Sequence, residues 1–168
     1  MRLPIYVTAL ALLGCAPSHE TIDVVKLSEV LEQALPKSSY DLSLRLVEVE
    51  RGGKDVIHCV LENTSAGPIT IDASTLPWET PGFFYINAVT PGGDVVRRSP
   101  VISVLSNPPR PITIEVGKSL EGEFEVQYLP FAALPRSQDL LLVWAYGVVN
   151  PEGSDSHRLG GTLVLKKR

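Results

Sequence analysis

The residues of this chain that could bind a metal are few and scattered. The 168-residue sequence holds three histidines and two cysteines. His19, His58 and His157 share no i, i+4 spacing with one another or with a cysteine, as helical zinc sites would require. A blue-copper site needs two histidines, a cysteine and usually an axial methionine, and the sole methionine is Met1. We therefore expect no metal site and no cofactor.

Motifs of catalysis are incomplete as well. Gly117-Lys118-Ser119 resembles the end of a phosphate-binding loop, but Ile112 stands where that loop needs a glycine. Residues 121–126 alternate like a strand, whereas the phosphate loop needs a helix there. No Gly-x-Ser-x-Gly elbow is present. We expect a turn at this point and assign no catalytic residue, so the protein is predicted not to be an enzyme.

Cys59 is predicted to be a buried structural residue. Alternation in the run Val56-Ile57-His58-Cys59-Val60-Leu61 places it on the same face as Ile57 and Leu61. An unpaired buried cysteine behaves as a small hydrophobe, while a nucleophile needs an electropositive and partly exposed setting. His58 should point to the opposite face of the strand, so the two side chains cannot act as a pair.

The first 14 residues have the form of an export signal. Arg2 is their only charge, and the apolar run at residues 5–13 is shorter than the roughly 20 residues needed to span a bilayer. The polar residues 18–20 prevent its extension. The alternative is a buried N-terminal strand or helix, which no periodicity in the segment supports.

The end of this signal, Leu12-Leu13-Gly14-Cys15, resembles the lipobox of bacterial lipoproteins. The resemblance implies cleavage before Cys15, a diacylglyceryl thioether on its sulfur and acylation of the freed amino group. Two or more acyl chains anchor a protein firmly, whereas one chain does so only marginally. Ala16 follows where an Asp often retains lipoproteins at the inner membrane. The resemblance thus implies a cell-envelope protein, at the periplasmic face of the outer membrane if two membranes are present.

The charge balance argues against nucleic acid as a partner. The full chain carries a formal net charge of −4, and loss of Arg2 with the signal leaves −5. A mildly acidic domain with dispersed charge does not suit a phosphate backbone. We expect Lys166-Lys167-Arg168 to be a solvated end.

Three segments are expected: a signal peptide at 1–14, a lipidated tether with a short helix at 15–39, and a β domain at 40–168. The helix should pack across one end of the domain, and Pro36 should end it. Its expected apolar face comprises Ile22, Val25, Val30, Leu31, Ala34 and Leu35.

From residue 40 the chain alternates between strand patterns and turn signals. A change of phase at Val47 and Val49 predicts a β-bulge, and Gly52-Gly53 and Gly92-Gly93-Asp94 predict hairpin turns. Eight or nine short strands of this kind predict an all-β fold, an antiparallel sandwich. Further strands are expected around Cys59 and at 69–71, 83–89, 95–97, 112–116, 120–129, 140–149 and 161–165.

Two stretches resemble bacterial immunoglobulin-like domains. Residues 60–71 run from a strand through a polar Asn63 turn into a Pro68-Ile69 entry, and residues 112–124 resemble a later hairpin. The resemblance implies an immunoglobulin-like β-sandwich but no activity. No second cysteine lies near Trp144 to bridge Cys59, so the antibody-type disulfide is not expected.

The best surface candidate is the Pro-flanked stretch at residues 76–85. Trp78 and Phe84 are predicted to be contacts for a partner, and the alternative is that Trp78 plugs the open end of the sandwich. These expectations combine into a membrane-anchored, non-catalytic binding or accessory lipoprotein whose protein partner is unknown. The alternative function is an inhibitor or immunity-type protein against a secreted enzyme or toxin, because a Pro-stiffened loop lowers the ordering cost of binding.

Overall fold

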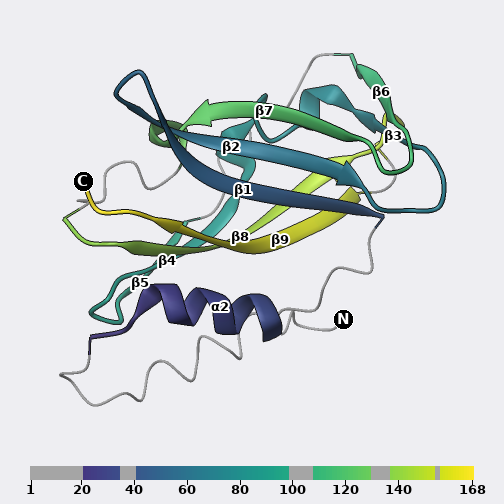
Figure 1. Ribbon diagram of the computed structural model, residues 1–168. Coiled ribbons are helices and arrows are strands. Elements are labelled where there is room, and N and C mark those ends of the chain that lie inside the picture. The colour runs from purple at the N-terminus through teal and green to yellow at the C-terminus, as the bar shows by residue number, and fades with distance from the viewer. Residues whose placement is uncertain (1–20, 35–40, 99–107, 130–136, 154–155) are drawn as a thin grey trace.

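The computed structural model describes residues 21–34, 41–98, 108–129, 137–153 and 156–168. Two antiparallel sheets face one another (Figure 1). The first contains β1 (Leu42–Arg51), β2 (Lys54–Asn63) and β7 (Ser119–Glu125) in that order. The second runs β5 (Val95–Arg98), β4 (Tyr85–Val89), β8 (Leu140–Val149) and β9 (Ser156–Leu165). A separate pair joins β3 (Ile69–Asp72) to β6 (Pro111–Ile114).

The predicted fold class is confirmed at this level: antiparallel β structure with one N-terminal helix, α2 (Val24–Ala34). Three short 3₁₀ turns complete the described elements: η2 (Ala73–Thr75), η3 (Pro81–Phe83) and η4 (Val126–Tyr128). None of the helices in the described ranges is long and apolar enough to cross a membrane.

The β1–β2 hairpin forms around the predicted Gly52-Gly53 turn. Both glycines have positive φ, 59° and 77°, as a two-residue hairpin of the favoured twist requires. Pairing continues without interruption from Arg51 opposite Lys54 to Leu42 opposite Asn63. The predicted bulge at Val47 and Val49 is therefore wrong, because both valines simply lie on the outer face of a regular strand.

The main core fills the space between the two sheets. Every second residue of β8, from Leu140 to Val148, points into it, and it meets Ile57, Cys59 and Leu61 from β2. The intervening residues Leu141 and Val143 are also buried, on the opposite face of β8. A strand apolar on both faces needs cover on both sides.

That second cover is α2, which lies against the outer face of the four-stranded sheet (Figure 1). The helix begins after Asp23, whose carboxylate accepts the backbone N–H groups of Val25 and Lys26, both at 3.1 Å. Its packed positions are Val24, Leu27, Ser28 and Leu31, the i, i+3, i+4, i+7 set of one helix face.

Both the predicted position and part of the predicted face of this helix are corrected. It covers a sheet rather than one end of the domain, and Val25 and Val30 are exposed at 39% and 53%. Beneath the helix, the Ser28 and Thr162 hydroxyls lie 2.8 Å apart, and the Thr162 hydroxyl donates to Glu32. The predicted residues Ala34 and Leu35 fall where no side-chain position is described.

Buried Asn63 joins the second strand to its neighbours. Its amide nitrogen donates to the Gly67 and Ile114 carbonyls, each at 2.8 Å, and its side-chain oxygen accepts from Ser65. Its backbone carbonyl accepts from Gly117, whose φ of 67° marks the predicted turn before β7. The Asn63 side chain therefore has partners for both its amide protons and its oxygen.

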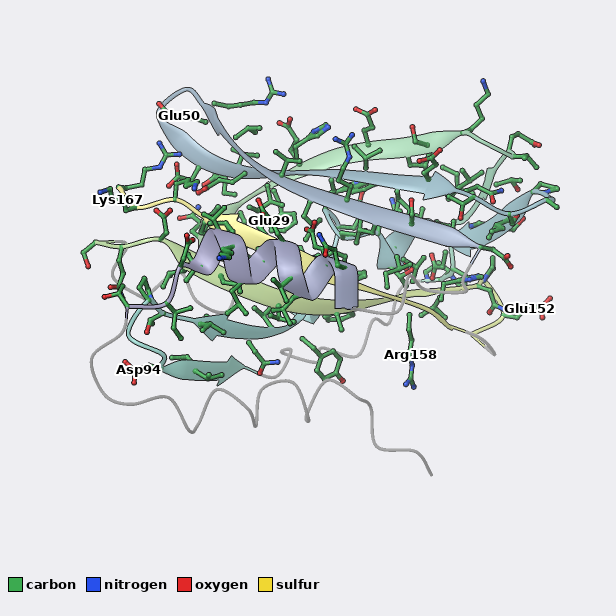
Figure 2. The ribbon with its side chains drawn as sticks, turned by 60° about the horizontal axis from the view of Figure 1, so that its bottom comes forward. Glu29, Glu50, Asp94, Glu152, Arg158 and Lys167 are labelled. Carbon is green, nitrogen blue, oxygen red and sulfur yellow. The ribbon has the colours of Figure 1, made fainter. Side chains whose placement is uncertain are left out.

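The C-terminal residues Lys166, Lys167 and Arg168 are exposed, as expected, and they also form contacts with the rest of the domain. The Lys166 backbone N–H donates to Glu48 of β1, and Arg168 forms ion pairs with Glu50 and Asp55. These contacts close the seam between β9 and the β1–β2 hairpin. Lys167 and Glu50 lie at the same end of the molecule (Figure 2).

Candidate functional site

The segment that carries Trp78 crosses from β3 to β4 and is held rigidly at its start. The Asp72 carboxylate caps η2 by accepting from the Ser74 backbone N–H at 2.9 Å. The same carboxylate accepts from the Arg110 backbone N–H at 2.9 Å. Burial alone would raise the pKa of Asp72, but these hydrogen bonds outweigh it and hold the pKa below its ordinary value.

The middle of the segment is fastened to β8 by Tyr146. The phenol oxygen lies 2.6 Å from the Thr80 hydroxyl, 3.2 Å from the Thr80 carbonyl and 3.1 Å from the Thr75 carbonyl. Burial raises the pKa of Tyr146 above its usual range. The phenol therefore stays protonated and acts as a structural hydrogen-bonding group.

Trp78 itself packs against Gly122 of β7. A β-carbon at Gly122 would overlap the indole ring, so this close approach depends on the absence of a side chain there. Trp78 is partly buried and packs against the main core. Because β7 is the last strand of its sheet, Trp78 lies at the side of the molecule, between β7 and the four-stranded sheet.

Phe84, the second predicted contact, is a core residue. It is 0% exposed, and its ring centroid lies 4.4 Å from Tyr146 and 5.9 Å from both Phe124 and Trp144. This position corrects the prediction, because a partner cannot reach the ring in this structure. The segment from 76 to 85 therefore supplies one partly exposed aromatic residue from the predicted pair.

Two exposed aromatic residues are not among the predicted contacts, although Tyr85 lies within the predicted surface stretch at residues 76–85. Tyr85 is 56% exposed on the outer face of β4, and Tyr128 is 57% exposed in η4. Strand alternation would have found Tyr85, since Phe84 and Ile86 on either side of it are buried. Tyr85 faces away from the core, on the side of the sheet that carries α2.

The outer face of the β1–β2–β7 sheet carries the main cluster of charged residues. His58 Nδ1 lies 3.2 Å from Glu123, and His58 Nε2 lies 3.5 Å from Glu121. Arg51 forms an ion pair with Glu123 at 2.7 Å, and Lys54 does so with Glu125. Paired, solvated charges of this kind describe a hydrated face rather than a catalytic arrangement.

Cys59 is buried in the main core and lies on the opposite side of β2 from His58, as predicted. Burial, with a smaller contribution from Glu123, raises the pKa of its thiol to about 12. The thiol is therefore protonated and unreactive at neutral pH. Cys15, the predicted lipidation site, lies outside the described residues, as does His19.

Within the described ranges, no group of three or more His, Cys, Asp and Glu side chains is arranged to hold a metal ion. His157 is partly buried at the start of β9, where it pairs with Val148.

Comparisons with known proteins leave the family open. No family model matches this chain, and no curated protein matches it. One similar solved structure is described as "X-ray structure of Northeast Structural Genomics Consortium target SoR45". It shares 11% sequence identity over 75% of this chain and 84% of that chain, with a TM-score of 0.39. At that score the likeness carries no argument about fold or function.

Proposed function

We propose that this protein is a membrane-anchored, non-catalytic binding or accessory lipoprotein of the bacterial cell envelope. The observation that carries the proposal is the run Leu12-Leu13-Gly14-Cys15 at the end of a short, singly charged apolar segment. Lipid on Cys15 holds the protein to a membrane, and the β domain meets a protein partner in the aqueous phase.

The position of the described core is compatible with an anchor at Cys15. The two hydrophobic clusters draw their members from Ile22 to Leu165. A lipid group seven residues before Ile22 therefore requires no rearrangement of these clusters.

We further propose that the two sheets form an immunoglobulin-like sandwich. In such folds one sheet contains the first, second, fifth and fourth strands, and the other contains the third, sixth and seventh, in some members with an added edge strand beside the third. The orders β1-β2-β7 and β5-β4-β8-β9 support this assignment. The short β6 occupies the chain position of the fourth strand, although it pairs with β3.

A rigid loop supports the second candidate function, an inhibitor or immunity-type protein. The hydrogen bonds at Asp72 and Tyr146 hold the Trp78 segment in one conformation, which lowers the entropy lost on binding. Glu79, which follows Trp78 in this segment, forms an exposed ion pair with Arg110 at 3.2 Å.

Intact-mass analysis of protein from a membrane fraction tests the anchor. We expect a chain that begins at Cys15 and carries added lipid mass, and we expect Cys15→Ser to lose both the added mass and the membrane association. Cys59→Ala is the matched control and should keep both, since its thiol is buried. A soluble wild-type chain that retains residues 1–14 contradicts the proposal.

A further inference from the structure

The point at which the chain joins the body determines which face can approach the membrane. Ile22 is fixed to the β4–β5 hairpin, since its backbone N–H donates to the Pro91 carbonyl at 2.7 Å. Its side chain packs with the cluster beneath α2, which includes Val24 at 4% exposure. Any tether from Cys15 therefore joins the described body at Ile22, on the α2 side of the molecule.

The tether is short compared with the thickness of the body. Ile22 follows Cys15 by seven positions, so the fully extended span between them is about 25 Å. A flexible chain of that length has an r.m.s. end-to-end distance of roughly 15 Å. A helix layer and two sheets, each about 10 Å from the next, place the outer side chains of the far sheet about 25 Å from the α2 axis. A tether that runs from Ile22 around the side of the domain to the outer face of this sheet would have to be longer than this distance.

We propose that the α2 layer and the β4–β5 hairpin form the membrane-proximal surface of this protein, and that the outer face of the β1–β2–β7 sheet points away from the lipid. The inference rests on the proposed lipidation of Cys15, and the occupant of the proximal side is the lipid surface itself. Even a fully extended tether is too short for the outer face of the β1–β2–β7 sheet to contact the bilayer. A tether at its r.m.s. length already allows α2 to contact it.

Both faces carry exposed charges, including Lys26, Glu29 and Glu32 on α2, but the two faces differ in how densely these charges are grouped. The far sheet displays the densest described set of ionic groups, and His58 with its glutamate neighbours remains hydrated there. Removing such groups from water at a bilayer would be costly. The exposed valines Val25 and Val30 lie instead on α2. Trp78 packs on β7, so its loop also stays in the aqueous phase, where a protein partner can reach it.

Depth-dependent fluorescence quenching tests the orientation on the lipidated full chain. Glu29→Cys on α2 (Glu29 is labelled in Figure 2) and Glu62→Cys on β2 are matched substitutions of exposed glutamates. Arg45→Cys adds a second far-face position. Each thiol is labelled with one fluorophore, since Cys59 is buried and Cys15 would be a thioether. The proteins are reconstituted in phosphatidylcholine/phosphatidylglycerol vesicles that contain nitroxide-labelled lipid.

We expect quenching at position 29 to exceed that at positions 62 and 45 several-fold. A Gly/Ser insertion of about 20 residues after Ala16 raises the r.m.s. tether length to roughly 29 Å and should abolish most of the difference. Equal quenching at the three positions, with lipid mass confirmed on Cys15, would overturn the orientation alone. A difference that persists with the long tether would overturn the tether as its cause. Absence of lipid mass on the chain would instead overturn the proposed function.

Discussion

The outer face of the four-stranded sheet is covered by α2, whereas that of the β1–β2–β7 sheet is not covered by a described element (Figure 1). The residue types in the central strands of the two sheets, β8 and β2, differ accordingly. On β8, Leu141 and Val143 face outward and are buried beneath α2. On β2, the outward residues His58 and Glu62 reach water, although Val56 at one end of the same face is buried. An uninterrupted apolar strand therefore marks the sheet that carries a second layer, and an alternating strand marks the sheet that meets water.

The largest expected effect comes from truncating one outward residue on each sheet. Leu141→Ala should lower the free energy of unfolding by about 2–5 kcal/mol, because it leaves a cavity between β8 and α2. Val47→Ala, at a position 37% exposed on β1, should change it by about 0.5 kcal/mol or less. Urea denaturation measures both. Equal losses would mean that the β1–β2–β7 face is also covered in solution.

An intermediate effect is expected from adding one methyl group to each sheet. Gly122→Ala should lower the free energy of unfolding by about 1–3 kcal/mol, because the new β-carbon displaces the Trp78 indole. Gly147→Ala on β8 is the matched control, has open space around it and should be nearly neutral.

A double-mutant cycle sharpens this result. Adding Trp78→Ala to Gly122→Ala should cost less than the sum of the two single changes, since the clash disappears with the ring. Strictly additive losses, measured by the same denaturation experiment, would show that Trp78 does not rest on Gly122.

The smallest effect concerns the end of the four-stranded sheet at which β8 begins and β9 ends. The Lys167 backbone N–H donates to Asp139 at 2.9 Å and, with Lys166, holds the pKa of Asp139 below its ordinary 3.8. A lowered folded-state pKa stabilises the fold above the unfolded-state value, and the benefit is lost as pH falls through the folded-state pKa. Asp139→Asn should therefore cost less than about 1 kcal/mol at pH 7 and progressively less below pH 3.8. A deficit that is unchanged at pH 3 would exclude the carboxylate's charge as its source.

Local signals in the sequence predicted most of the strands. The positive-φ glycines at 52, 53 and 117 fixed turns at the expected places, and β8 has the bounds that its apolar run predicts. These predictions are correct because a turn glycine or an apolar run determines the backbone conformation of the residues next to it in the sequence.

Long-range packing limited the rest of the prediction. The bulge was predicted because Val47 was assumed to face the core. The same assumption placed Val25 and Val30 on the packed face of the helix, where they do not lie. Asp23 caps the helix, and the spacing of the apolar residues alone does not indicate this cap. In the candidate site, Phe84 was named as a contact although strand alternation already distinguished it from Tyr85. The contact between Trp78 and Gly122 joins residues 44 positions apart, so no pattern of neighbouring residues in the sequence predicts it.

The seam between β9 and the β1–β2 hairpin has a consequence for how the chain acquires its fold. The hairpin can form early because its strands are adjacent in sequence, but β9 supplies Leu159, Leu163 and Leu165 to the same core. The last residue, Arg168, reaches back to Glu50 and Asp55. Contacts between residues far apart in the sequence slow folding, because the chain loses the entropy of loop closure before these stabilising contacts form. β9 must therefore be synthesised before the domain can close, and under the proposed export signal this delay keeps the nascent chain open while it is threaded through a membrane.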